Sequence, residues 1–431
     1  MFSIFGHRGR FCDGVSRRDM LQIGALGIGG LTLADVLRSE AAAGETKSPK
    51  SIINVFLGGG PSHIDMFDLK PDAPKEIRGE FNPIDTNVAG IQICEHMPRL
   101  ASMMDKLAIV RSIAGLRDEH APNQPETGWD ETSLKSVGGR PSIGSIIAKL
   151  QGPTRPDSPA FVDLNGHSKH GFLGPVFGAF RPDGEGRQNL KLNGVTVDRL
   201  GDRQKLLTGL DRLRREADTH GMMEAMDSFT QRAVGVVTSG RIADALNLEK
   251  EDPRIRERYN SHNKRNGNEN DRFLVARRLV EAGVRCVSLS WGGWDTHGDN
   301  FNALRRQLPP LDQGLATLIE DLDARGMYED TTILVWGEFG RTPRVNGTMG
   351  RDHWARVASV LIGGGGLRMG QVVGSTNRLG EIPKDRPVHL QEIFATLYHN
   401  MGIDTRYTTL IDPNGRPQYL VDHREPMREF V

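Results

Sequence analysis

Short apolar runs alternate along this chain with longer segments in which apolar residues recur at helical spacing. The runs are rich in β-branched residues and end in glycine or polar residues, which is typical of buried strands. Strands are predicted at 51–57, 107–112, 160–164, 284–290, 331–336 and 358–363. Helices are predicted at 141–150, 273–282, 303–325 and 389–401.

This alternation predicts an α/β fold with a mostly parallel central sheet and helices on both faces. A charged segment of helical spacing, at about 197–258, is predicted to be a helical insertion in that domain. Ligands of such sheets bind beyond the carboxyl ends of the strands. The residues that flank the strands at that edge are therefore the candidates for chemistry.

The N-terminal segment predicts export. Ser16–Leu21 carries two adjacent arginines, an uncharged stretch follows at 23–34, and small residues at 41–44 offer a cleavage site. This order predicts a signal peptide over 1–43, a linker over 44–50 and the main domain over 51–431. The paired arginines resemble a twin-arginine signal, so we expect the twin-arginine export machinery as a partner and a periplasmic or secreted protein. The apolar stretch is too short for a stable membrane span, and the alternative is an amphipathic helix that stays attached.

Charge and cysteine content add two expectations. The 55 basic and 55 acidic residues cancel, which argues against nucleic acid as a partner. Beyond the predicted signal the cysteines are Cys94 and Cys286. A disulfide between them is one alternative, but Cys286 falls in a predicted core strand, which favours a buried thiol.

Side chains that bind metals or move protons gather next to the predicted strands. His63 and Asp65 follow the first strand, and Asp118, His120 and Asn123 follow the second. Asp295 and His297 follow the strand at 284–290, and Glu338 and Arg341 follow the strand at 331–336. Asp352 and His353 precede the last strand. Carboxylates combined with imidazoles suit Zn²⁺ or Mn²⁺, whereas carboxylates alone favour Ca²⁺ or Mg²⁺. The pattern predicts a shared divalent metal site at one edge of the sheet.

Each of these groups also has a simpler interpretation. Asp295 and His297 could form a turn with a solvated imidazole, and Asp352 with His353 could cap a helix. Arg341 could bind the oxygens of an anionic substrate, or it could hold its loop through a salt bridge. The recurrence of such groups at one edge is what favours the metal site.

Several longer segments resemble those of a known superfamily. The stretch 311–335 is similar to the helix and strand before a metal-binding loop of sulfatases, and 388–403 is similar to the helix that closes their domain. His353 is similar to their late metal- or substrate-binding histidine. The motifs at 58–68, 292–297, 337–343 and 350–354 resemble an exported family catalogued as domain of unknown function 1501. The chain thus resembles the alkaline-phosphatase/sulfatase-like superfamily, over roughly 51–130 and 270–405.

The chain departs from that superfamily among the expected ligands. Gly58–Gly60 stands where a sulfatase or phosphatase has an aspartate, and His63 or Asp65 would replace it from slightly downstream. Glu338 keeps the carboxylate of the later loop, while Phe339 replaces the neighbouring ligand. The resemblance implies a divalent ion, with expected ligands His63, Asp65, Asp295, His297, Glu338, Asp352 and His353.

The nucleophile position departs further. Neither a formylglycine precursor nor a phosphatase-type serine or threonine is evident before Thr127-Gly128, and His120 or Asn123 would lie near that place. The resemblance therefore implies metal-assisted hydrolysis of an anionic phosphate or sulfate ester by direct attack of water. In that mechanism His120 acts as base or acid, and Arg341 binds the anionic ester.

A second class of function is left open. The fold could serve as an inactive module that binds sulfated or phosphorylated glycans, which the missing aspartate and nucleophile favour. A surface-assembly protein is a weaker third alternative. Such a protein would expose large apolar patches, and the composition does not indicate them. Convergence of the carboxylates and imidazoles within about 5 Å of one point would support the metal site. If they scatter, the binding module is favoured.

Overall fold

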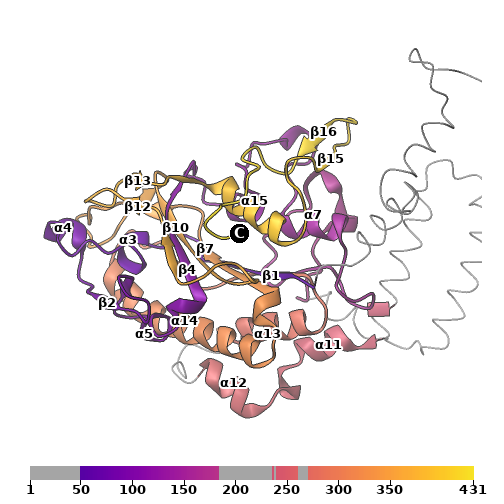
Figure 1. Cartoon of the computed structure of the whole chain (residues 1–431), viewed down its shortest axis with the longest axis horizontal. Helices are drawn as coiled ribbons and strands as arrows, with labels where there is room; N and C mark the ends of the chain where they lie inside the picture. The colour runs from indigo at the N-terminus through magenta and orange to yellow at the C-terminus, as the bar shows by residue number, and fades with distance from the viewer. Residues whose placement is uncertain (1–48, 184–234, 237–238, 261–269) are drawn as a thin grey trace, which may run out of the picture. The chain divides into compact units, whose positions relative to one another are not determined.

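An eight-stranded sheet forms the centre of the computed structural model, which describes residues 49–183, 235–236, 239–260 and 270–431 (Figure 1). Its order is β11-β4-β10-β7-β1-β6-β5, and β14 pairs with β4 beside this path. The strands are β1 (Ser51–Phe56), β4 (Leu107–Ala114), β5 (Phe161–Asp163), β6 (Cys286–Ser290), β7 (Thr331–Trp336), β10 (Ala358–Gly364), β11 (Gln371–Val373) and β14 (Val388–His389). The predicted signal peptide and most of the predicted helical insertion lie outside the described residues.

Most strand pairs of the central sheet are parallel, as the alternating pattern predicts. β1 pairs in parallel with β6 and β7, and β5 pairs in parallel with β6. The exception is β10, which runs antiparallel to both β4 and β7. Because Ala358 at the start of β10 pairs with Ile113 near the end of β4, the residues before β10 lie at the carboxyl edge of the parallel strands.

The central strand β1 shows why the sheet is buried on both sides. All six of its residues are buried, and successive side chains of a strand point to opposite faces. Ile53 and Val55 belong to one hydrophobic cluster and Ile52 to another. Strands that are buried on both faces are typically continuous apolar runs, and the sequence of β1 is nearly such a run.

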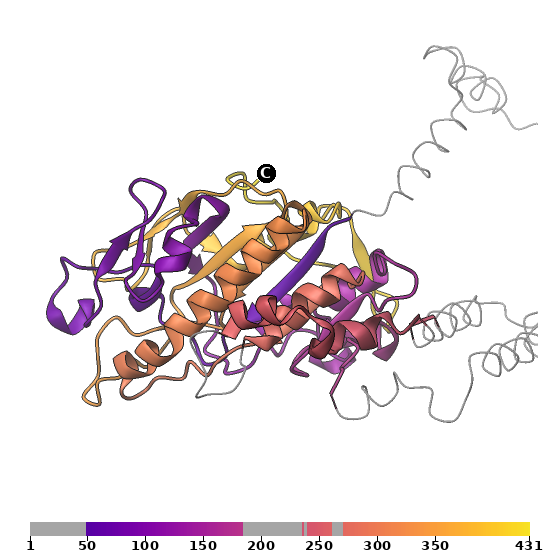
Figure 2. The same ribbon diagram turned by 90° about the horizontal axis from the view of Figure 1, so that it is seen from below.

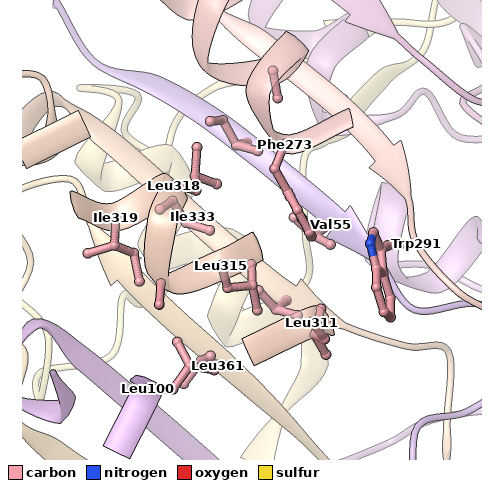
Figure 3. Packing of buried hydrophobic residues seen from close by; sticks show 14 of the residues in the cluster. Val55, Leu100, Phe273, Trp291, Leu311, Leu315, Leu318, Ile319, Ile333 and Leu361 are labelled. Atoms are coloured by element: carbon pink, nitrogen blue, oxygen red, sulfur yellow. The ribbon is translucent and has the colours of Figure 1, made fainter. Parts of the chain in front are cut away.

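Helices cover both faces. On one face α13 (Asp271–Glu281) and α14 (Asn300–Ala324) supply Phe273, Leu315 and Leu318 to the cluster that contains Val55 (Figure 3). Figure 2 shows α14, in orange, running across the sheet on this side. On the other face α7 (Ile143–Leu150) and α15 (Leu390–Asn400) pack on the cluster that contains Ile52.

Smaller elements complete the described part of the chain. The ones that shape the site are α3 (His63–Met66), α6 (Asn123–Thr127), β8 (Gly340–Arg341) and β9 (His353–Trp354). Two short helices, α11 (Arg241–Leu246) and α12 (Pro253–Asn260), lie in or next to the described end of the predicted insertion. The other α-helices and strands are α4 (Lys75–Arg78), α5 (Pro98–Ala101), β2 (Pro83–Asp85), β3 (Gln92–Cys94), β12 (Ser375–Thr376), β13 (Pro383–Asp385), β15 (Thr409–Ile411) and β16 (Pro417–Tyr419).

One further expectation, that of a buried free thiol, is confirmed within this fold. Cys94 and Cys286 are buried and unpaired, so the disulfide alternative is wrong. Burial raises the pKa of each thiol to about 12. Among the helices described, none is both long and apolar enough to cross a membrane.

Candidate metal centre

Loops at the carboxyl edge of the sheet bring three histidines around one aspartate. Asp295 and His297 follow β6, His120 follows β4, and His353 lies in β9, before β10. These side chains are far apart in the sequence, and the mixed direction of the strands places them at one edge. The ligand atoms of His120, Asp295 and His353 all lie within 4.8 Å of one another.

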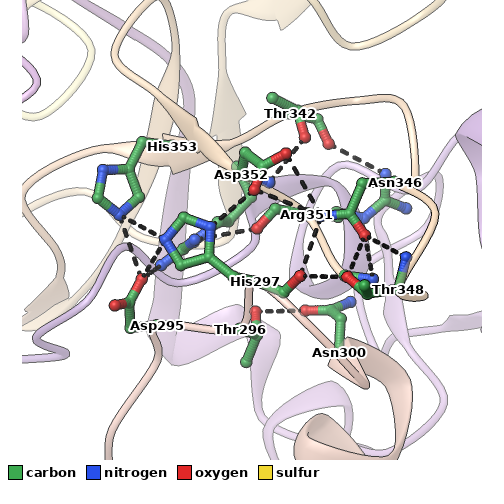
Figure 4. Close-up of polar contacts among 12 residues, drawn as sticks. Asp295, Thr296, His297, Asn300, Thr342, Asn346, Thr348, Arg351, Asp352 and His353 are labelled. Atoms are coloured by element: carbon green, nitrogen blue, oxygen red, sulfur yellow. Dashed lines mark hydrogen bonds and ion pairs between the residues drawn. The ribbon is translucent and has the colours of Figure 1, made fainter.

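The closest part of this cluster is a triangle of three ligand atoms (Figure 4). The Nε2 atoms of His297 and His353 lie 3.0 and 3.2 Å from Oδ1 of Asp295. The two Nε2 atoms are 3.1 Å apart. In a tetrahedral site with ligands at about 2.0–2.1 Å, neighbouring ligand atoms are separated by roughly 3.3 Å. The triangle therefore has nearly the size that a bound zinc-like ion requires.

Carboxylates hold the far side of both rings. Nδ1 of His297 lies 2.7 Å from Asp352 Oδ1, and Nδ1 of His353 lies 2.9 Å from Asp118 Oδ1. An ionised carboxylate only accepts hydrogen bonds, so each Nδ1 carries the hydrogen and, in the neutral ring, Nε2 carries a lone pair. Two such lone pairs and a carboxylate oxygen then face one another. Carboxylate–histidine pairs of this kind orient metal ligands in proteins, and the donor set fits a divalent cation.

His120 repeats the arrangement on the other side of the aspartate. Its Nε2 lies 3.2 Å from Asp295 Oδ2, and its Nδ1 lies 3.3 Å from Oε1 of Glu338. Glu338 is buried and accepts hydrogen bonds from the backbone N–H groups of Gly59 and Gly60. Burial raises the pKa of Glu338. Glu338 therefore orients His120 and does not reach the triangle as a ligand.

The glycines after β1 are required by the close approach of the loop that carries Asp295. Gly59 has φ +105°, and a Cβ there would lie 2.5 Å from the backbone nitrogen of Asp295. Only glycine permits this close approach in that conformation. The loop thus supplies N–H groups to Glu338 instead of a carboxylate of its own.

Arg341 is fully buried and serves the loops rather than a substrate. Its Nε donates to the carbonyl of Gly60, its Nη1 to that of Arg351, and its Nη2 lies 2.5 Å from Asp295 Oδ1. Although burial raises the pKa of Asp295, the hydrogen bond from Arg341 and the neighbouring imidazoles of His120 and His353 lower it overall, so the carboxylate stays ionised. The expectation that Arg341 binds an anionic ester is corrected, because its donors are used and it has no exposed surface.

His63 and Asp65 do not join the cluster either. Asp65 is buried and forms a two-pronged ion pair with Arg351, with both N–O distances 2.8 Å. It also accepts hydrogen bonds from Ser62 and Asn300. His63 is buried with its Nε2 3.1 Å from the carbonyl of Gly380. Their expected role as metal ligands is corrected, since both groups are committed to packing the loops together.

The remaining predicted residues lie around the cluster. Asp352 is a partner of His297 rather than a ligand, and Asn346 also contacts its carboxylate. Asn123 begins α6 and accepts a hydrogen bond from the Thr127 hydroxyl through its backbone carbonyl. Asp118 was expected at the strand edge, but its role could not be predicted. Its partner His353 is 235 residues away in the sequence.

Comparisons with known proteins place the chain in a family. The family model described as "Protein of unknown function (DUF1501)" matches residues 49–431. No curated protein matches the sequence.

Several solved structures share a weak likeness with the chain. The lipoteichoic acid synthase LtaP from Listeria monocytogenes is 10% identical, with a TM-score of 0.34 over 83% of this chain and 73% of that one. The PsFucS1 sulfatase from Pseudoalteromonas sp. is 11% identical, with a TM-score of 0.35 over 87% and 72%. The phosphonate monoester hydrolase of Agrobacterium radiobacter is 14% identical, with a TM-score of 0.32 over 82% and 74%.

Proposed function

The chain belongs to the DUF1501 family over residues 49–431, and we propose that it is a metal-dependent hydrolase of phosphate or sulfate esters. One observation carries the proposal. Nε2 of His297 and Nε2 of His353 meet Oδ1 of Asp295 at 3.0–3.2 Å while carboxylates hold their opposite nitrogens. Without a cation these acceptors face one another unfavourably.

Asp295, His297 and His353 would hold the ion, at a place that is open to solvent. A divalent ion bound there would polarise an ester oxygen and lower the pKa of a water. Arg341 fixes the Asp295 carboxylate from its buried side. The chain's own contribution is therefore a preformed, rigidly held set of three ligands.

His120 is the group best placed to move a proton. Its Nδ1 lies 3.3 Å from Glu338, and its Nε2 lies 3.2 Å from Asp295 Oδ2, on the side of the metal cluster. There Nε2 could accept a proton from water and return it to the leaving group. The side chain is half exposed, so an ester can reach it. The hydroxyl of Thr127 is bonded to the carbonyl of Asn123, which favours direct attack of water over a covalent intermediate.

The site is open rather than enclosed. The side chains of Asp295, His297 and Asp352 are 43%, 47% and 53% exposed. An open site suits an ester displayed on a larger molecule better than a small free metabolite, which is usually held in a concave pocket.

The test uses the full chain, stripped with a chelator and titrated with Zn²⁺ or Mn²⁺ by calorimetry, alongside assays with aryl phosphates and aryl sulfates. We expect His297→Ala and His353→Ala to abolish tight metal binding and turnover. Asp118→Asn and Asp352→Asn should weaken metal binding by about 10–100-fold. His399→Ala, an exposed histidine of α15, is the matched control. Metal binding that is untouched in both histidine variants would refute the site, and tight metal binding without turnover would favour the glycan-binding module.

A further inference from the structure

A polar cavity reaches Arg117, the residue before Asp118 of the candidate metal centre. It has a volume of about 210 Å³ and is bounded by the 115–130 segment, the start of α15 and the 422–423 loop. Its polar lining includes Arg117, Asp130, Asp422, His389 and His423. None of these groups has a role in the proposed hydrolysis.

Two glutamines make the cavity walls rigid. The side chain of Gln124 bonds both the N–H and the carbonyl of Arg117, at 2.7 and 2.9 Å. The side chain of Gln391 accepts from the N–H groups of Asp422 and His423, and it donates to the carbonyl of Gly128. Both glutamines are buried, so a preformed site is held there with little entropy left to lose on binding.

An aromatic wall and polar groups of both kinds face this space. The indole of Trp129 is oriented by a 3.0 Å hydrogen bond to the Leu420 carbonyl. The rings of His389 and His423 stack with their centroids 3.8 Å apart. Within the described residues, the Arg117 guanidinium and the Asp422 carboxylate make no side-chain hydrogen bond, and both are exposed. They are therefore available to a ligand.

The charge of the lining indicates an uncharged, hydroxyl-rich ligand. The lining carries the Arg117 guanidinium and the carboxylates of Asp130 and Asp422. The Arg140 guanidinium covers one face of Trp129, 3.7 Å from the ring centroid, and is attracted by Asp422. The charges around the cavity therefore balance, and neither an anion nor a cation is favoured. A ligand with several hydroxyl groups can donate to the carboxylates and accept from Arg117. Its apolar C–H face would contact Trp129. The volume is below the roughly 300–1,000 Å³ of sites for drug-sized ligands, which suits a single sugar ring.

The position of the cavity connects it with the metal centre. Arg117 directly precedes Asp118, which holds His353, and adjacent Cα atoms are only about 3.8 Å apart. We propose that this cavity binds one neutral sugar residue of the substrate, so that the ester hydrolysed at the metal centre is carried by a glycan. The substrate assignment rests on the proposed function, whereas sugar binding itself does not.

Sugar binding is tested with the full chain and the methyl glycosides of glucose, galactose and mannose, by saturation-transfer NMR and tryptophan fluorescence. At least one glycoside should bind. Asp422→Asn and Trp129→Ala should each weaken that binding by about tenfold, the effect of losing one good contact. Trp129→Phe should restore part of it, since an aromatic face remains. Tyr407→Ala, an exposed aromatic residue that does not line this cavity, should change nothing.

The two proposals fail in different ways. His353→Ala should lose the metal and keep the glycoside, which separates sugar binding from hydrolysis. The cavity proposal is overturned if none of the glycosides binds, if binding survives both Asp422→Asn and Trp129→Ala, or if inorganic sulfate competes for the same site. Asp422 is exposed, so its variant is expected to fold even if Trp129→Ala does not.

Discussion

A buried carboxyl group beneath the site should make the protein less stable as the pH rises. Glu126 in α6 is 3% exposed. Its oxygens accept hydrogen bonds from Asn54, Ser168 and Ser288 at 3.1, 3.1 and 3.3 Å. Burial, aided by the nearby carboxylate of Asp163, raises the pKa of Glu126 from 4.5 to about 8.

The sign follows from which state holds the proton. Below pH 4.5 both the folded and the unfolded chain carry it. Between that pH and about 8 the folded chain keeps the proton while the unfolded chain loses it, so each pH unit lowers the free energy of unfolding by about 1.4 kcal/mol. From pH 5 to pH 8 this group alone therefore costs about 4 kcal/mol.

Glu126→Gln removes the titration while keeping the shape of the side chain. The amide oxygen can still accept from Asn54, and the serine hydroxyls can rotate to accept from the amide nitrogen. We expect wild type and variant to have similar stabilities at pH 5, and the variant to be more stable by about 4 kcal/mol at pH 8. Urea unfolding followed by tryptophan fluorescence across this range measures the difference.

Glu131→Gln is the matched control, since Glu131 is exposed and five residues away. Its stability should follow the wild type at every pH. If the Glu126→Gln and wild-type curves run parallel within about 0.5 kcal/mol, the amount expected of a neutral surface change, then Glu126 is ionised in the folded protein and the reasoning is wrong.

Two further predictions concern the scaffold. Arg351→Ala should destabilise the protein by about 3–5 kcal/mol, because it leaves the buried Asp65 carboxylate without its partner. Urea unfolding of this variant tests the prediction. The double variant Arg351→Met/Asp65→Leu should recover much of the lost stability in the same assay. Leu315→Ala in α14 should cost about 2–5 kcal/mol, since that side chain is 1% exposed in the core. The same change at Leu150, which is 37% exposed, should cost about 0.5 kcal/mol or less, and equal losses at the two positions would contradict the packing argument.

Local patterns were sufficient to predict the secondary structure of the sheet and its covering helices. The strand at 331–336 is predicted and observed with the same bounds, because a continuous apolar run between polar segments reports burial on both faces. The helix at 303–325 is observed at Asn300–Ala324. Periodicity did not reveal that β10 is antiparallel, since direction depends on which strands it joins.

The candidate site, like the fold, could be predicted only in part from the sequence. Residue type and position at strand ends singled out His120, Asp295, His297 and His353 as candidates, because chemistry gathers where strands of an α/β sheet end. The sequence could not distinguish them from His63 and Asp65, which stand in an equally suggestive loop.

Tertiary packing made that distinction. Asp65 forms an ion pair with the buried Arg351, because a buried carboxylate is stable only when it is paired. It is therefore not available to a metal. Arg341 and Glu338 are buried and form hydrogen bonds with backbone groups. Arg341 also positions Asp295, and Glu338 positions His120. Asp118 acquired its role from a histidine that the fold brought to it across 235 residues. Local composition and spacing in the sequence identify which residues are chemically able to form a site. Which of them meet, and which are used up in holding the loops, depends on long-range burial and hydrogen bonding that only the folded chain provides.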